Sequence, residues 1–239
     1  YKREPVAVVE EKKEKKFAHT LKPSIEFGKA ARIPQVKNML DEFDIVHLHY
    51  PFFGTASLVY KWKKKNPNKK LVITYHMDTR SPGWKGLIFS TYARYYMPRI
   101  LRSADALVAS SFDYIEASDA FTIFKEKEDR SFEIPFGVDL DRFAPREKPV
   151  ELFSKHGLDI SKPVLLFVGG MDTAHYFKGV PVLLSALHLL KKQGKNIQTM
   201  LVGGGNLKKD FELRTKGLGL DSFVKFAGQV SDAELPMYY

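Results

Sequence analysis

The feature that most constrains the fold is a regular alternation of short apolar runs with longer segments of helical pattern. Short apolar runs bounded by polar residues predict buried strands, and helices between such strands predict parallel pairing, with helices on both faces of the sheet. The clearest runs lie at 44–49, 71–75, 106–109, 163–168, 197–202 and 223–227. We therefore expect an α/β protein built on parallel sheets.

This alternation is interrupted at 134–149, a turn-rich stretch that ends in a polar passage with two prolines, as domain linkers often do. We place a first domain at 1–148, opened by a strand at 5–9 and a charged loop, and a second at 149–239. A doubly wound domain usually has about five or six strands, so we expect the second domain, with about three, to be incomplete. The first begins without the strand and glycine-rich turn that commonly open such a domain, so we expect its start to be missing.

Composition excludes several classes of protein. Cysteine is absent, which excludes disulfides and thiolate metal sites and fits a reducing cytoplasm. No stretch approaches the roughly 20 apolar residues that span a bilayer. The net charge of +10 indicates either a solvated lysine-rich surface or attraction to phosphates or anionic lipid. We expect no nucleic-acid partner, because no recognition motif accompanies the charge.

Glycines follow two of the predicted strands in the second domain, as Gly169-Gly170 and as 203–205, and Lys178 stands at the start of a predicted helix. Carboxyl ends of parallel strands form the ligand-binding edge of such sheets. A helix N-terminus beside a lysine favours an anion, so the pattern indicates a diphosphate site. Ordinary tight turns are the alternative, since the G-x-G-x-x-G spacing is absent.

Histidines gather at the equivalent edge of the first domain. His76 directly follows the strand at 71–75, where it would orient a sugar hydroxyl or transfer a proton. His47 and His49 lie in the neighbouring strand, and we expect His47 to be hydrogen-bonded to backbone within the sheet. Zinc is not expected, because the three histidines lack the usual ligand spacing.

Two further segments carry surface predictions. The predicted long helix at 84–102 has apolar positions all round, so we expect it to be buried between sheet and loops and not to lie on a membrane. Lysines concentrate between Lys61 and Lys70, forming either a solvated patch or a contact with an anionic membrane surface.

The helix predicted at 178–192 carries one apolar stripe, and Ser231 with Glu234 resembles a capping box.

Several segments, in order along nearly the whole chain, resemble motifs of glycosyltransferase family 4, a group of retaining enzymes with the GT-B fold of two Rossmann-like domains. The strand at 44–49 resembles D-[IV]-V-H-x-H, and 74–78 resembles T-x-H. The other similar segments are 103–111 (A-D-x-[IV]-x-x-S), 134–145 (I-P-x-G-V-D…F-x-P), 167–186 (F-V-G-R-L-D…K-G-V…L-L-x-A), 201–205 and 224–230.

The resemblance implies transfer of a sugar from a nucleotide-diphosphate sugar to an acceptor hydroxyl of a sugar, lipid-linked or polysaccharide acceptor, with retained configuration and no metal or other cofactor. It implies a cytoplasmic protein, peripheral to the inner membrane face. His76 and Lys178 are implied as catalytic residues. The donor residues implied are Gly169, Gly170, Lys178, Gly203, Gly204, Gln229 and Val230, and the acceptor-side residues are Tyr50, Met77 and Asp78.

Two departures from the family pattern matter. Gly170 stands where the family usually has an arginine that binds the diphosphate, so His175, another basic group or backbone donors would have to compensate. The family's E-x7-E carboxylates would lie beyond Tyr239, and its glycine-rich acceptor-side loop before Tyr1. We therefore expect a truncated chain that is inactive, or nearly so, alone. A nucleotide-sugar epimerase or glycogen-type synthase, and a non-catalytic nucleotide-sugar binding protein, are the alternatives.

Overall fold

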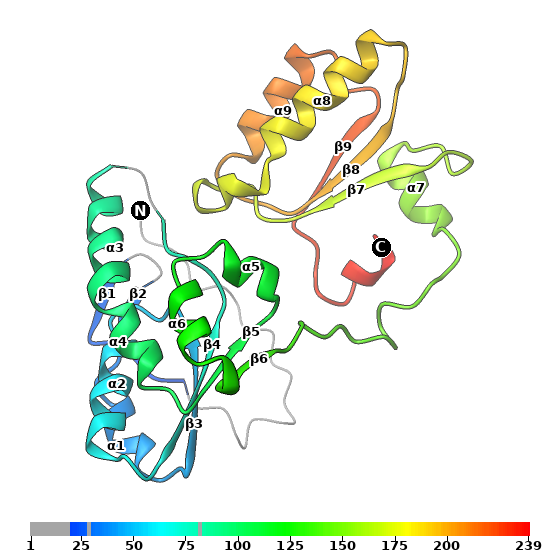
Figure 1. Ribbon diagram of the computed structural model, residues 1–239. Coiled ribbons are helices and arrows are strands. Elements are labelled where there is room, and N and C mark those ends of the chain that lie inside the picture. Colours follow the sequence, from blue (N-terminus) through cyan, green and yellow to red (C-terminus); the bar gives the residue numbers. More distant parts are fainter. Residues whose placement is uncertain (1–19, 28–29, 81–82) are drawn as a thin grey trace. The chain divides into compact units, whose positions relative to one another are not determined.

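The computed structural model describes residues 20–27, 30–80 and 83–239, and it divides into two compact units, 1–137 and 138–239 (Figure 1). The strand predicted at 5–9 and the charged loop after it lie outside the described residues. Each unit contains its own parallel sheet and its own hydrophobic core. The division falls within the turn-rich stretch that begins at residue 134.

Unit 1 is built on a four-stranded parallel sheet in the order β3-β4-β5-β6. Strands β3 (Ile45–Tyr50), β4 (Lys70–Tyr75) and β5 (Ala106–Ala109) confirm three predicted strands. Strand β6 (Ser131–Glu133) was not predicted, because it has only three residues and carries an exposed Phe132. An antiparallel pair, β1 (Ile25–Phe27) and β2 (Ala30–Arg32), was also missed.

The described helices of unit 1 cover one face of this sheet, where we expected helices on both. Alternate residues of β3, such as Val46 and Leu48, join buried side chains of four helices in one core, whereas His47 and His49 on the other face are exposed. The helical segments with their bounds are α1 (Val36–Leu40), α2 (Ala56–Lys65), α3 (Trp84–Tyr95), α4 (Met97–Arg102), α5 (Phe112–Glu116), α6 (Phe121–Glu126) and the 3-10 turn η1 (Glu128–Arg130).

The helix predicted at 84–102 is two helices, α3 and α4, which meet at Tyr96. Pro98 accounts for the break, because it has no N–H to continue the helical hydrogen bonding and it favours the first turn of a new helix. Our prediction of burial holds for α4, whose Met97, Ile100 and Leu101 are in the core. It is wrong for α3, which carries exposed apolar side chains along its length.

Unit 2 is built on a three-stranded parallel sheet in the order β7-β8-β9. Strands β7 (Val164–Val168), β8 (Gln198–Val202) and β9 (Val224–Gly228) confirm the predicted ones. Helices α8 (Val180–Lys192) and α9 (Lys208–Gly217) pack on one face. β7 is half-buried along its length, not buried as predicted, because it is an edge strand of this sheet.

The second face of the unit 2 sheet meets helix α7 (Val150–His156) and the 3-10 turn η3 (Leu235–Met237) (Figure 1). A cavity of about 190 Å³ remains there between sheet residues such as Leu166 and the side chains of Leu152 and Phe153. Helix α7 was not predicted. The helices on both faces of unit 2 agree with the expected architecture.

Two local predictions in unit 2 are confirmed. The apolar stripe of α8 faces the core, with Val180, Leu184 and Leu187 buried. Ser231 and Glu234 form the reciprocal bonds of a capping box: the Glu234 N–H donates to Ser231 Oγ at 3.3 Å, and the Ser231 N–H donates to Glu234 Oε2 at 3.1 Å. The segment that follows is a single 3-10 turn, where we expected a helix.

Replacing Leu184 by alanine should destabilise unit 2, because Leu184 is fully buried between α8 and the sheet. We expect a loss of about 2–5 kcal/mol in the free energy of unfolding, measured by urea denaturation followed by circular dichroism. Val182→Ala on the exposed side of the same helix is the control and should change stability by no more than about 0.5 kcal/mol. Equal losses in both variants would contradict this account of the core.

Candidate functional site

Backbone hydrogen bonds join the carboxyl ends of the three strands of unit 2 into one continuous edge. The Gly169 N–H donates to the Val202 carbonyl at 2.9 Å, and the Gly203 N–H donates to the Gly228 carbonyl at 2.8 Å. Beyond the strands, the Met171 N–H donates to the Gly204 carbonyl at 2.8 Å. We call this surface, at 169–171, 203–205 and 228–230, the glycine edge.

Glycine is required at two positions of the glycine edge. Gly203 has a φ of +135°, and a Cβ atom there would lie 1.9 Å from the carbonyl oxygen of Gly169. Gly205 has a φ of +151°, and a Cβ atom there would lie 2.3 Å from the carbonyl oxygen of Met171. Both values are far below van der Waals contact. The absence of side chains therefore allows the loops after β7 and β8 to touch backbone to backbone.

Lys178 lies against this edge, as the sequence predicted. Its Nζ is 3.0 Å from the position that a Cβ atom of Gly169 would take, and its side chain is exposed. Lys178 ends the 3-10 turn η2 (Thr173–Lys178), and Gly179, in the left-handed conformation, leads directly into α8. The ammonium group and the N-terminus of α8 are thus neighbours in sequence, and both attract anions.

His175 occupies the space beside Gly170. Its Nδ1 is 2.7 Å from the position of a Cβ atom on Gly170, so a side chain at residue 170 would collide with the imidazole. The same Nδ1 lies 2.8 Å from Oδ2 of Asp172 and 2.9 Å from Oδ1. The carboxylate therefore fixes the orientation of the ring and favours a proton on Nδ1. Sequence reasoning named His175 only as one of several groups that could compensate for Gly170.

Gln229 completes the edge on the β9 side. Its Cβ is 3.5 Å, and its Oε1 3.7 Å, from the position of a Cβ atom on Gly204. Val230 follows and is half-buried. The structure therefore brings Lys178 and Gln229 to one edge together with the glycines after β7 and β8. The donor-binding roles of these residues stay predictions.

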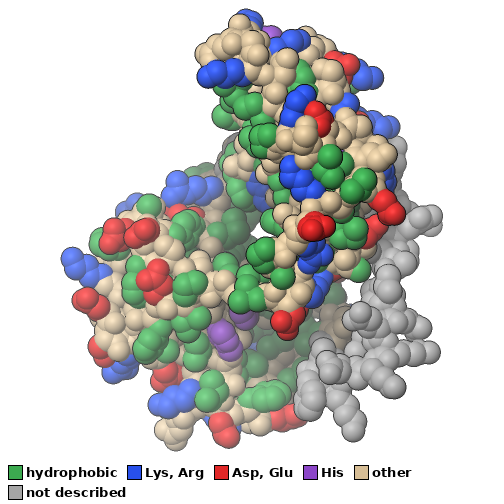
Figure 2. Space-filling view, turned by 90° about the vertical axis from the view of Figure 1, so that its right-hand side faces the viewer, with side chains coloured by type: hydrophobic (Ala, Val, Ile, Leu, Met, Phe, Trp, Pro, Cys, Tyr) green, Lys and Arg blue, Asp and Glu red, His purple; other side chains and the backbone are tan. Residues whose placement is uncertain are grey.

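In unit 1, the three predicted histidines form a ladder of rings on the exposed face of the sheet. The ring centroids of His47 and His49 are 4.6 Å apart, and those of His49 and His76 are 5.0 Å apart. His49 Nδ1 lies 2.7 Å from His76 Nε2, so one of these two nitrogens donates a hydrogen bond to the other. Phe136 stacks on His76 with a centroid distance of 5.6 Å. Histidine side chains, purple in the lower part of Figure 2, reach the surface among hydrophobic ones.

The surroundings of His47 and His76 favour the neutral form of these two rings. Burial lowers the pKa of His76 below its ordinary value of 6.5, and His49 and His47 lower it further. Burial also lowers the pKa of His47, with a second contribution from His49. We expected His47 to bond backbone, which is wrong: its Nε2 lies 2.7 Å from the hydroxyl Oγ1 of Thr74 on the adjacent strand. Because Nε2 of His76 is hydrogen-bonded to His49, Nδ1 is the ring nitrogen of His76 that a ligand would contact.

The three predicted acceptor-side residues differ in exposure. Met77 is exposed, whereas Tyr50 is buried and stacks on Tyr75 at a centroid distance of 5.5 Å. The carboxylate of Asp78 accepts hydrogen bonds from the Tyr75 hydroxyl at 2.5 Å and from the Asp119 N–H at 3.1 Å. It also pairs with Arg80, and its side chain is only 9% exposed. Asp78 thus ties the end of β4 to the segment between α5 and α6.

The lysine-rich segment between Lys61 and Lys70 is partly neutralised by ion pairs. Lys63 is buried and lies 2.8 Å from a carboxylate oxygen of Asp105, and Lys69 pairs with Asp44 at 3.0 Å. Lys70 lies 3.7 Å from Asp105. The exposed lysines of α2 are Lys61, Lys64 and Lys65. In the part of the chain that the structure describes, no helix is long and apolar enough to cross a membrane.

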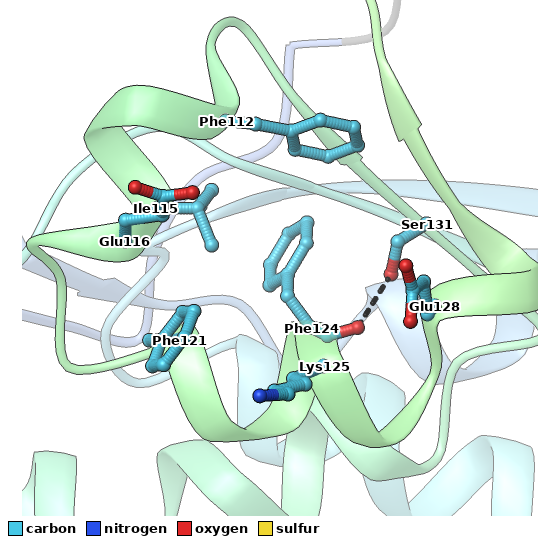
Figure 3. Close-up of a pocket in the computed structure, with 8 residues that line it drawn as sticks. All are labelled: Phe112, Ile115, Glu116, Phe121, Phe124, Lys125, Glu128 and Ser131. Atoms are coloured by element: carbon cyan, nitrogen blue, oxygen red, sulfur yellow. Dashed lines mark hydrogen bonds between the residues drawn. The ribbon is translucent and has the colours of Figure 1, made fainter.

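A cavity of about 330 Å³ lies between α5, α6 and β6 (Figure 3). The side chains of Ile115, Phe121 and Phe124 lie around it, with Phe112 above and Glu116, Lys125 and Glu128 nearby. None of the predicted site residues lines it, and sequence reasoning missed it because α6 was not predicted. Within the described ranges, no group of three or more His, Cys, Asp or Glu side chains is placed to hold a metal ion.

Two α/β units, each built on a parallel sheet, agree with the GT-B fold. A solved structure of this fold, the α,α-trehalose 6-phosphate synthase of Burkholderia multivorans, superposes with a TM-score of 0.55 at 14% identity, covering 84% of this chain and 52% of that one. Residues 7–142 match the model of Glycosyltransferase Family 4, and residues 150–239 match that of Glycosyl transferases group 1. The chain belongs to glycosyltransferase family 4.

Curated relatives are also glycosyltransferases. The chain is 32% identical to the D-rhamnosyltransferase WbpZ of Pseudomonas aeruginosa, over 84% of this chain and 47% of that protein. It is 27% identical to the O-antigen chain mannosyltransferase C of Escherichia coli, over 84% of this chain and 48% of that protein. The chain thus spans about half the length of the curated relatives it matches.

Unit 1 should lose stability as the pH falls below about 6.5, because the lowered pKa values of His47 and His76 mean that the unfolded state binds more protons in that range. The stabilisation is complete above the ordinary pKa and is lost as the pH falls through the folded one. Tryptophan fluorescence during urea unfolding reports on this unit, since Trp62 and Trp84 both belong to it.

His76→Gln should make this pH dependence shallower between about pH 7.5 and 5.5, because it removes one of the titrating groups. Met77→Gln changes the neighbouring exposed residue, keeps all three histidines and should leave the pH dependence as in the unaltered chain. An unchanged slope in His76→Gln would show that the ladder does not hold His76 neutral.

Proposed function

We propose that this chain forms the donor-binding part of an enzyme that transfers a sugar from a nucleotide-diphosphate sugar to an acceptor hydroxyl. The observation that carries the proposal is the glycine edge, where backbone, Lys178 and His175 converge. Membership of glycosyltransferase family 4 and the glycosyltransferase names of the relatives support it. The main contribution of the glycine edge to sugar transfer would be electrostatic stabilisation of the diphosphate.

Negative charge grows on the leaving diphosphate as the bond to the sugar breaks. Fixed cations and N–H groups aimed at that diphosphate stabilise the transition state more than the ground state. Lys178 supplies one positive charge beside Gly169. His175 fills the place of the arginine that the family usually has at residue 170, and Asp172 holds its imidazole in position through Nδ1. These groups would act without a resident metal.

In this proposal, His76 lies against the transferred sugar, and transfer retains the anomeric configuration. The free Nδ1 of His76 is suited to a sugar hydroxyl, because Nε2 is engaged with His49. Gln229 and Val230 hold the base through their backbone, next to Gly204. Tyr50, Met77 and Asp78 border the acceptor side, with Tyr50 and Asp78 acting through the packing of β3 and β4 and Met77 by direct contact.

The relatives' names narrow the donor sugar. One relative is a mannosyltransferase and the other a D-rhamnosyltransferase, and D-rhamnose is mannose without its 6-hydroxyl. We therefore propose a sugar of the mannose series, transferred to a sugar, lipid-linked or polysaccharide acceptor in the cytoplasm. A peripheral contact of the inner membrane face through Lys61–Lys70 stays a prediction, carried by the three exposed lysines of α2.

A thermal-shift titration with GDP, UDP and ADP, each with and without mannose or glucose attached, tests the proposal. A ligand at about one hundred times its dissociation constant stabilises a protein by about 2.7 kcal/mol, which is visible as a raised melting temperature. We expect one nucleotide to raise it. Lys178→Ala should weaken that binding about tenfold or more, as expected for a lost charge-assisted hydrogen bond.

His175→Ala should weaken nucleotide binding in the same direction, because the edge loses its second basic group. Lys216→Ala removes an exposed lysine from the last turn of α9 and should leave the affinity unchanged. Binding that is equally strong in Lys178→Ala and Lys216→Ala would overturn the assignment of the diphosphate to the glycine edge.

A further inference from the structure

The loop between β7 and α8 presents two exposed aromatic residues beside the glycine edge. Tyr176 and Phe177 lie within η2, between His175 and Lys178, and they are 63% and 60% exposed. We call these two side chains the η2 rings. One exposed apolar side chain needs no explanation, but two large adjacent rings at the ligand-binding edge of a parallel sheet indicate a contact with a ligand.

The loop that carries the η2 rings is anchored to the rest of unit 2. Met171, near its start, is buried in the core. The Thr173 N–H donates to Oδ1 of Asn206 at 3.2 Å, and at the end of the loop the Gly179 N–H donates to the Tyr176 carbonyl at 3.2 Å. The exposure of the two rings is therefore built into a fixed loop, as is usual for binding residues that a rigid scaffold positions.

Contacts among the rings set their orientation. The centroids of Tyr176 and Phe177 are 6.1 Å apart with the ring planes at 83°, the edge-to-face arrangement that aromatic pairs prefer. Phe177 also lies 6.1 Å from the ring of His175, which Asp172 holds beside Gly170. A chain of ring contacts thus joins the exposed side chains to the glycine edge, so a ligand at that edge meets them in a defined orientation.

The neighbours of the η2 rings indicate which part of a donor they would meet. His175 precedes them and lies beside Gly170, whereas Lys178 follows them and lies beside Gly169. The rings are therefore next to the groups proposed to hold the diphosphate. In a nucleotide-diphosphate sugar, the sugar is bonded directly to the diphosphate, and the ribose separates the base from it. The group nearest the rings is then the sugar.

The order of the strands agrees with this placement. Strand β7, which leads into the η2 loop, is at one edge of the sheet, and β9 is at the other. The proposed function places the base beside Gln229, directly after β9, and the diphosphate at the turns after β7 and β8. A donor laid across the glycine edge in this direction would carry its sugar past the end of β7, on the side of the η2 rings.

We propose that the η2 rings are a specificity surface for the sugar of the donor, with its pyranose ring packed against an aromatic face. A pyranose has C–H bonds on its faces and hydroxyls around its rim. The face of an aromatic ring is negative, so it attracts polarised C–H groups, while the sugar hydroxyls stay in water. The Tyr176 hydroxyl can also donate to or accept from a sugar hydroxyl. The assignment rests on the proposed function.

Calorimetric titration with GDP and with GDP-mannose tests the assignment, or with the UDP or ADP pair if the thermal-shift titration selects that nucleotide. We expect mannose to strengthen binding to the unaltered chain. Tyr176→Ala and Phe177→Ala should each weaken binding of the nucleotide sugar about two- to tenfold, as expected for one lost ring contact. Neither variant should change the affinity for the nucleotide without its sugar.

Two further variants control for other causes. Phe177→Leu keeps an apolar side chain but removes the flat ring, so it should weaken binding of the nucleotide sugar as Phe177→Ala does. Tyr95→Ala on α3 removes another exposed ring, one that is 53% exposed, and should leave both affinities unchanged. Because all these positions are exposed, the unliganded variants should melt at the temperature of the unaltered chain.

The outcomes separate this assignment from the proposed function. Ring variants that bind nucleotide and nucleotide sugar as the unaltered chain does would overturn the assignment alone. Variants that weaken both ligands equally would also overturn it, because aromatic rings stack on bases too and the rings would then hold the base. Failure of GDP, UDP and ADP to bind the unaltered chain would instead contradict the proposed function, and the assignment with it.

Discussion

The close approach of the Gly203 backbone to the carbonyl oxygen of Gly169 is the constraint on which the candidate donor site depends. A Cβ atom at residue 203 would lie 1.9 Å from that oxygen, so the turns after β7 and β8 meet only because no side chain intervenes. Where they meet, Lys178 lies beside Gly169, and Gln229 lies beside Gly204. Any side chain at residue 203 would force these loops apart and separate the groups proposed to hold the diphosphate.

The carboxyl-terminal edges of the two sheets present different chemical groups to a ligand. In unit 2 the edge is made of backbone, with a lysine and an Asp-oriented histidine beside it, and such a surface suits an anion. In unit 1 the corresponding strands present stacked imidazoles, and the pKa values of His47 and His76 are lowered by burial, so these two rings donate and accept hydrogen bonds without adding charge. A nucleotide sugar has both kinds of group, a charged diphosphate and neutral hydroxyls. Each sheet edge, taken by itself, is thus suited to one kind of group.

Much of the fold could be predicted from the sequence, because buried strands and the stripe of α8 appear as local patterns. Strand β6 and helices α6 and α7 were missed because each is short and none carries a long apolar period. The exposure of α3 could not be read from periodicity. Its apolar residues go all round the helix, and only the packing of Phe89 and Tyr92 on Phe53 decides which side faces outward.

For the candidate site, local motifs located the glycines, Lys178 and His76, whereas contacts across the chain decided the rest. The position of His175 beside Gly170 follows from the shape of η2, and sequence alone left it as one option among several. Ion pairs of Lys63 with Asp105 and of Lys69 with Asp44 join residues far apart in sequence. The sequence therefore overstated how many lysines of this segment carry a positive charge without a carboxylate partner. Motifs thus predicted residue types at an edge, but not the partners of those residues.

The most direct measurement of the central claim is a two-dimensional ¹H–¹⁵N NMR titration of this chain with the nucleotide that binds. Glycine amides occupy a distinct region of the spectrum, so the N–H groups of the glycine edge can be followed individually once assigned. We expect the amides of Gly169, Gly170, Gly203 and Gly204 to shift together with the same dissociation constant, and to stop shifting when Lys178 is replaced by alanine. Shifts confined to α5 and α6, around Phe112 and Phe124, would contradict the claim and place the nucleotide in the other cavity.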